Sequence, residues 1–251
     1  GASLHLLNFL PGTLLTEQSF SRACDLLRDE GHSVETQILG DGESFDSELT
    51  RLADSVKSPR VWVGHSLGGI FALNLAIRHP DKCAAIVCIS STARADAPSN
   101  HDKRLAQLHR AQSAGSCEPI SLEMKPVFGL TARSPLATSL VRQAESVGLR
   151  RFAHQVHYAL TRPNRADRCH TINCPILAIV GIDDDICPTD LSDEIIALGA
   201  LENRNQRARI AGAGHLVPMT HPQQVAARID EFLATIQPPK TLSFPSKNFA
   251  Q

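Results

Sequence analysis

The chain lacks an excess of charge, a long hydrophobic run and a paired cysteine motif, and each absence excludes a class of function. Its 251 residues carry a formal net charge of −1, so the overall charge favours neither a nucleic acid nor an anionic membrane as a partner. No segment approaches the roughly 20 consecutive apolar residues of a membrane-spanning helix. We therefore expect no nucleic acid and no membrane among the partners of this protein.

The seven cysteines are odd in number and scattered, and no C-x-x-C pair occurs. Zinc sites and thiol redox centres use closely spaced pairs, so the cysteines favour neither. The N-terminus enters an apolar run without the basic segment and cleavage site of a secretory signal. Free thiols and no signal predict a chain of the reducing cytoplasm.

Short apolar runs alternate with helical patterns along most of the chain. Such runs, bounded by Gly and Pro, predict strands at 4–10, 33–39, 60–64, 84–89, 175–181 and 207–211. Apolar residues at helical spacing predict helices at 16–31, 45–56, 67–78, 191–198 and 221–236. This alternation indicates an α/β fold with an open, mainly parallel sheet of about six strands and helices on both faces.

One gap, residues 92–171, interrupts the alternation and carries helical patterns at 103–114, 135–147 and 149–160. It is too long for a loop, so it predicts a helical cap inserted after the strand at 84–89. The core then comprises residues 1–91 and 172–237, and residues 238–251 form a loosely held C-terminal tail.

Charge separates along the same boundary. Residues 99–170 hold 11 Lys or Arg against 5 Asp or Glu, and the rest of the chain is acidic. The positive charge could face the site and attract a carboxylate or a phosphate group. It could equally be solvated, or paired with the acidic core. Four cap residues at helical spacing could also line the pocket: Arg151, His154, Gln155 and Tyr158.

The stretch VWVGHSLGGIF (61–71) places Ser66 between a strand and a helix, in the pattern Gly64-x-Ser66-x-Gly68. This is the pattern of a nucleophile elbow, in which a strained turn exposes the serine and small neighbours let strand and helix approach. The helix that follows points its first N–H groups, led by that of Leu67, at an oxyanion forming beside the serine. Ser66 is therefore a candidate nucleophile, and a glycine-rich turn with a surface serine is the alternative.

A serine needs a base and an acid that orients the base, and both follow in the order serine, acid, histidine. Residues 181–188 follow one predicted strand and contain three consecutive aspartates, of which one can orient a histidine. Residues 212–218 follow the next predicted strand and contain His215. Because the carboxyl ends of parallel strands lie at one edge of the sheet, we expect these groups to meet at Ser66.

Two further features bear on the oxyanion site. The loop after the first strand contains Gly12, and the backbone N–H of Thr13 or of Leu14 could supply a second oxyanion donor. His65 lies beside the serine in sequence, but its side chain should point away from the serine, so we interpret it as a packing residue.

Four stretches resemble the α/β-hydrolase fold superfamily, in particular its compact, capped esterase-type serine hydrolases: LPGTLL (10–15), GHSLGG (64–69), INCPILAIVGIDDDICP (172–188) and GAGHLVPMTHPQQVAARIDEFL (212–233). The resemblance covers residues 4 to 236. It implies that Asp184, by its spacing from a glycine and a proline, is the acid, and that Thr13 is the second oxyanion donor. It also implies a sheet in the family order 4-3-5-6-7-8, without the family's first two strands.

The function implied is hydrolysis of a carboxylic ester, thioester or lactone of a small molecule through an acyl-Ser66 intermediate. That substrate is anionic if the positive charge of the cap faces the site. This serine chemistry implies no metal and no organic cofactor. His215 would act as the base, Asp184 would orient it, and the N–H groups of Leu67 and Thr13 would form the oxyanion hole. Such folds also perform C–C bond hydrolysis and cofactor-free lyase or synthase reactions, or serve as ligand sensors without turnover. We expect a monomer or a homodimer.

Overall fold

The computed structural model describes residues 4–131, 133–200 and 204–238, and most of the predicted tail at 238–251 lies outside them. Six strands form one sheet: β1 (Leu6–Leu10), β2 (Ser33–Thr36), β3 (Arg60–His65), β4 (Cys83–Ile89), β5 (Ile176–Gly181) and β6 (Gln206–Ile210). All neighbouring strands are parallel. Their order, β2-β1-β3-β4-β5-β6, confirms the predicted sheet.

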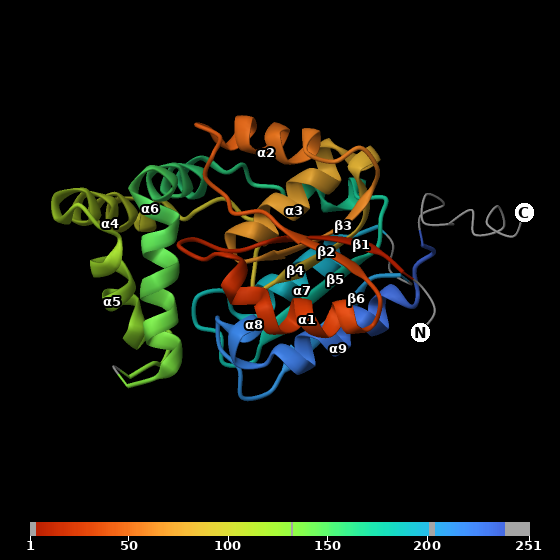
Figure 1. The fold of residues 1–251 in the computed structure, drawn as a ribbon. Helices are drawn as coiled ribbons and strands as arrows, with labels where there is room; N and C mark the ends of the chain where they lie inside the picture. Colours follow the sequence, from red (N-terminus) through yellow and green to blue (C-terminus); the bar gives the residue numbers. More distant parts are fainter. Residues whose placement is uncertain (1–3, 132, 201–203, 239–251) are drawn as a thin grey trace, which may run out of the picture.

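Helices cover both faces of the sheet (Figure 1). One face packs against α2 (Phe45–Asp54), α3 (Leu67–Arg78) and α7 (Thr189–Leu198). The other face packs against α1 (Ser21–Asp29) and α9 (Pro222–Leu233). Because both faces are covered, strands such as β5 are buried along their whole length, which explains their continuous apolar sequences.

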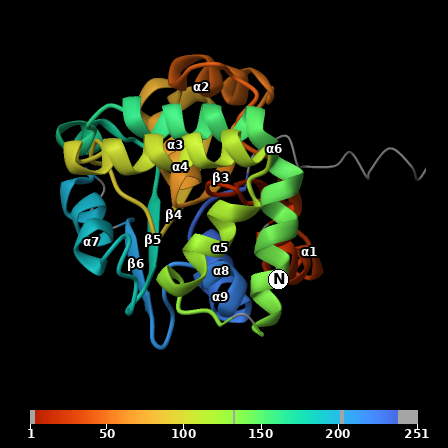
Figure 2. The ribbon, with the colours of Figure 1, turned by 90° about the vertical axis from the view of Figure 1, so that its left-hand side faces the viewer.

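Three helices lie between β4 and β5 in the chain: α4 (His101–Ala114), α5 (Glu118–Val127) and α6 (Pro135–Thr161). We call them the helical insertion. They lie together at one end of the sheet, with α4 and α6 side by side across it (Figures 1 and 2). They have a small core of their own, which includes Ala111, Ile120 and Phe152.

Most helices begin and end within about three residues of the predicted bounds. Helix α5 was not predicted, whereas the two helices predicted at 135–147 and 149–160 are the two segments of α6. Gly148, at a φ of 81°, breaks the helical path between them. The remaining elements are short: α8 (Val217–Thr220) and 3-10 turns at η1 (Glu17–Phe20), η2 (Pro80–Lys82), η3 (Pro98–Asn100) and η4 (Ala166–Thr171). The helix predicted at 16–31 thus begins as the turn η1.

All seven cysteines are free thiols. Six are buried and Cys174 is half-buried. Within the described residues, no helix is long and apolar enough to cross a membrane.

Candidate active site

Ser66 lies on a strained turn between β3 and α3, with φ 55° and ψ −113°. A non-glycine residue adopts a positive φ only where its surroundings enforce it. Here the chain approaches too closely for larger neighbours: a Cβ atom on Gly64 would lie 2.1 Å from the Gly68 oxygen, and one on Gly68 would lie 1.9 Å from the Leu10 oxygen. The two glycines are therefore required for strand β3 and helix α3 to hold Ser66 in this position.

Two hydrogen bonds from the adjacent strand fix the turn. The Ser66 N–H donates to the Ile89 oxygen at 2.9 Å, and the Ser91 hydroxyl donates to the Ser66 oxygen at 2.8 Å. Both partners lie at the carboxyl end of β4, so the sheet itself positions the serine.

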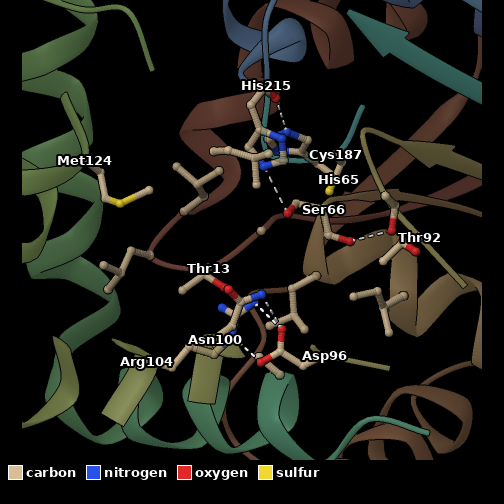
Figure 3. Close-up of a pocket in the computed structure, with 18 of the residues that line it drawn as sticks. Thr13, His65, Ser66, Thr92, Asp96, Asn100, Arg104, Met124, Cys187 and His215 are labelled. Carbon is tan, nitrogen blue, oxygen red and sulfur yellow. Dashed lines mark hydrogen bonds and ion pairs between the residues drawn. The ribbon is translucent and has the colours of Figure 1, made fainter. Parts of the chain in front are cut away.

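The structure brings the three residues of the predicted relay together. His215 Nε2 lies 3.1 Å from Ser66 Oγ. Its Nδ1 lies 3.0 Å from Asp184 Oδ2 and 3.2 Å from Oδ1. Because a carboxylate accepts the Nδ1 proton, the neutral ring has an unprotonated Nε2 facing the hydroxyl. Figure 3 shows Ser66 and His215 directed toward each other.

Burial separates Asp184 from its two neighbours in the sequence. Asp184 is buried, whereas Asp183 and Asp185 are exposed. Its Oδ1 also accepts hydrogen bonds from the N–H groups of Ile186 and Cys187, each at 2.9 Å. Burial alone would raise the pKa of the Asp184 carboxyl, but His215 and the Cys187 N–H bring it below its ordinary value. Asp184 is thus held as a carboxylate beside the imidazole.

The N–H groups of Leu67 and Thr13 are both available at this site. Leu67 is the first residue of α3, so its N–H has no acceptor within the helix. Among the described residues no acceptor is found for the Thr13 N–H either, whereas the Leu14 N–H donates to Gln155 Oε1 at 3.0 Å. Of the two donors left open by the sequence, Thr13 is therefore the one whose N–H remains free.

Ser66, His215 and Thr13 line a cavity of about 370 Å³ beneath the helical insertion. The insertion supplies an apolar wall with Ile120, Met124, Phe128, Leu140 and Phe152. The Phe128 ring lies parallel to that of His215, with ring centres 6.2 Å apart. This wall suits the hydrocarbon part of a small organic substrate.

The Alpha/beta hydrolase family matches residues 13–228 of this chain. The chain belongs to that family. One curated relative, named "Putative carbamate hydrolase RutD", from Escherichia coli O157:H7, is 25% identical over 239 residues, covering 91% of this chain and 86% of the relative.

Two solved structures share the fold of this alpha/beta hydrolase. A thermophilic esterase from Thermogutta terrifontis, described with malate bound, has a TM-score of 0.80 at 23% identity and covers 92% of this chain and 90% of its own. MenH from S. aureus has a TM-score of 0.78 at 21% identity, covering 92% and 94%. At these identities the likeness concerns the fold.

Two glutamines of α6 hold the Thr13 loop of this alpha/beta hydrolase: Gln155, which the sequence suggested as a pocket-lining residue, and Gln143, which it did not suggest. Gln155 is fully buried; it accepts from the Leu14 N–H and donates from Nε2 to the Leu39 oxygen at 2.8 Å. Gln143 Oε1 accepts from the Thr16 N–H at 3.0 Å. Leu14, whose N–H donates to Gln155, has a positive φ of 59°. The insertion therefore fixes the loop that carries the Thr13 N–H.

His65 does more than pack. Its Nε2–H donates to the backbone oxygen of His215 at 2.7 Å, so it anchors the loop that carries the proposed base. Burial, and then repulsion from His215, lowers the pKa of His65 to about 3. The ring is thus neutral, and His65 is a positioning residue that its place in the sequence did not reveal.

The arginines at 99–170 include some that form ion pairs away from the cavity and some that line it. Arg150 and Arg151 form ion pairs with Asp41 of the core, and Arg110 pairs with Glu123 on the outside. His154 and Tyr158 likewise form hydrogen bonds to the Gly40–Gly42 segment, so the helical face at 151–158 holds a loop of the core. The four residues of this face that the sequence suggested as pocket-lining do not line the cavity. By contrast, Arg104 and Arg162 do line the cavity.

Proposed function

We propose that this protein is a serine hydrolase that cleaves a carboxylic ester, thioester or lactone of a small molecule through an acyl-Ser66 intermediate. The observation that carries the proposal is the hydrogen-bonded chain from Ser66 through His215 to Asp184, open to the cavity at the serine. A free serine is a weak nucleophile, and a neutral imidazole within hydrogen-bond distance is the group that activates it.

In the first step His215 Nε2 takes the Ser66 proton as Oγ attacks the carbonyl carbon of the substrate. The negative charge that develops on the carbonyl oxygen is stabilised by the N–H groups of Leu67 and Thr13. Asp184 stabilises the imidazolium, which then gives its proton to the departing alcohol or thiol. Ser66 is left as an ester of the acyl group.

In the second step water attacks the acyl-Ser66 carbonyl and His215 takes the proton of that water. The second tetrahedral intermediate collapses, the acid is released, and the imidazolium returns the proton to Ser66 Oγ. No cofactor enters either step.

The comparisons support this reaction class. The names of the curated relative and of the esterase refer to reactions at acyl carbons that bear a heteroatom, and the carbamate and ester reactions both proceed through a tetrahedral oxyanion.

The test is hydrolysis of short p-nitrophenyl esters by the protein and by its Ser66→Ala variant. We expect the variant to lose roughly 10⁴-fold or more in kcat while its thermal unfolding stays close to that of the unmodified protein. A fluorophosphonate should label Ser66 alone, as located by mass spectrometry. Substantial activity in the alanine variant would rule out the covalent mechanism.

Two other results would redirect the proposal. Labelling of Ser66 with no turnover of any ester would favour a ligand sensor. Feeble ester turnover beside efficient cleavage of a C–C bond in a diketone would favour the C–C hydrolase.

A further inference from the structure

The cavity is also lined by four charged residues that the proposed reaction does not use: Arg94, Asp96, Arg104 and Arg162. Asp96 precedes the turn η3, Arg104 lies on α4, and Arg162 directly follows α6. Figure 3 shows Asp96 and Arg104 on the side of the cavity opposite His215, with Thr13 between.

Arg104 donates hydrogen bonds to both carboxylate oxygens of Asp96. Its Nε donates to Asp96 Oδ2 at 2.7 Å and its Nη2 to Oδ1 at 2.9 Å, which is the paired geometry preferred between guanidinium and carboxylate. Asn100 adds a longer bond to Oδ1 at 3.3 Å. The Asp96 side chain is 1% exposed, so this pair forms a closed structural unit.

Arg162 lies beside this pair but forms no hydrogen bond with Asp96. Its Nη2 lies 3.8 Å from Asp96 Oδ1, beyond hydrogen-bond distance, and its Nε donates to the Arg94 backbone oxygen at 3.0 Å. No hydrogen-bond acceptor for its terminal nitrogens is found in the part of the chain that the structure describes, although the side chain is only 10% exposed, and the residue lines the cavity.

The local charges compensate this cation only in part, because one carboxylate faces two guanidinium groups. Two other titratable groups nearby add no negative charge: His101 lies 3.8 Å from the same carboxylate, and burial raises the pKa of the Cys187 thiol to about 12. Arg94, which also borders the cavity, pairs with Glu194. Burial and the neighbouring Arg104 lower the pKa of Arg162, whereas Asp96 opposes the change. An anion at this position would relieve an unfavourable desolvated charge.

We propose that Arg162, supported by the Asp96–Arg104 pair, forms a carboxylate-binding subsite, so that the substrate is an ester bearing a free carboxylate away from the scissile bond. This proposal rests on the proposed function. A carboxylate fits better than a phosphate monoester because the excess is a single positive charge, which one carboxylate balances and a largely dianionic phosphate exceeds.

The first experiment measures kcat/KM for matched pairs of esters. One pair is the mono-p-nitrophenyl ester of a linear dicarboxylic acid and its neutral methyl-capped analogue. The other pair carries the carboxylate, or its methyl ester, on the alcohol side of a butyrate ester. We expect a preference for one anionic member of about 10- to 100-fold, the range of a charged hydrogen bond.

Arg162→Gln should reduce that ratio to near one, and Arg162→Lys should retain part of it. The control Arg110→Gln removes a cation of the same insertion that pairs with Glu123 outside the cavity, and it should leave the ratio unchanged. A protein with no preference for either anionic ester, or a preference that survives in Arg162→Gln, would overturn the subsite.

A second readout separates this failure from that of the proposed function. Linear dicarboxylates such as adipate should bind the Ser66→Ala variant in calorimetry, and the added Arg162→Gln change should weaken binding by the same factor. Binding without ester turnover would uphold the subsite and reject the hydrolase. Turnover of neutral esters without dicarboxylate binding would uphold the hydrolase and reject the subsite.

Discussion

The two loops that meet at Ser66 are held by different parts of the molecule. The turn that carries Ser66 and Leu67 is fixed by the sheet: Gly64 belongs to β3, Gly68 packs against Leu10 of β1, and the Ser66 N–H donates to Ile89 of β4. The loop that carries Thr13 is fixed by α6, through glutamines 127 and 141 residues away in the sequence. The sheet therefore positions the proposed nucleophile, whereas the helical insertion positions one of the two proposed oxyanion donors. We expect changes in the insertion to alter the rate of the proposed reaction without disturbing Ser66.

The largest effect should come from the sheet-borne relay. Asp184→Asn removes the charge that keeps the proton on His215 Nδ1, and we expect kcat for a p-nitrophenyl ester to fall about 10⁴-fold. Asp185→Asn is the matched control, because Asp185 is exposed beside it, and kcat should change less than about twofold. Equal losses in the two variants would contradict the assignment of Asp184.

The next effect tests how rigidly the sheet holds the elbow. Gly68→Ala would place a Cβ atom 1.9 Å from the Leu10 oxygen, so the free energy of unfolding should fall by about 3 kcal/mol or more. In Gly214→Ala, the added atom would meet nothing closer than 3.9 Å, so chemical denaturation should show a much smaller change. A stable, active Gly68→Ala protein would show that strand and helix can separate at the elbow.

The insertion-held loop should give a smaller loss confined to the chemical step. Gln155→Leu removes the acceptor of the Leu14 N–H and the donor to Leu39, so the Thr13 N–H should lose its alignment. We expect kcat to fall about 10- to 100-fold, within the range for loss of an oxyanion donor, with KM changing little.

Affinity for a boronic acid, which mimics the tetrahedral intermediate, should fall in parallel with kcat in Gln155→Leu. The control Gln112→Leu lies on the exposed side of α4 and should leave both quantities unchanged. A KM effect without a kcat effect would place Gln155 in substrate binding instead.

The smallest effect is a pH dependence of stability. The pKa of His65 is about 3 in the folded protein, against an ordinary value of about 6.5 in the unfolded chain, so between these values only the unfolded chain is protonated there. The stabilisation is complete above about pH 6.5 and is lost as the pH falls toward 3, by roughly tenfold in the unfolding constant per pH unit. His65→Gln, which cannot titrate, should show a shallower slope between pH 6.5 and 4.5 in urea unfolding; an unchanged slope would contradict the low pKa.

The sheet could be predicted from the sequence because its signals are local. Each strand is a buried apolar run bounded by Gly or Pro, and alternation with helices implies the parallel order. Helix α5 escaped prediction because its ten residues include Pro119 and Pro126, which blur a short apolar pattern.

For the candidate site, the proposed catalytic residues could be predicted from the sequence, but the side chains that position them or line the cavity could not. Ser66, Asp184 and His215 each follow a strand within a few residues, so the strand order alone brings them to one edge. The roles of Gln155 and Arg162 depend on partners more than 60 residues away. Composition likewise revealed the positive charge of the insertion, but only the tertiary structure decides that Arg150 lies 3.0 Å from the Asp41 carboxylate whereas Arg162 lies 3.8 Å from that of Asp96.

The buried thiols can be used to follow local opening of the structure by their rates of alkylation. Burial raises the pKa of every one of the seven cysteines, so alkylation, which needs the thiolate, is slow until a segment opens. Cys117 lies in the core of the insertion, and Cys88 lies at the centre of the sheet. We therefore expect the ratio of their alkylation rates to report how often the core of the insertion opens while the sheet stays folded, with no engineered cysteine.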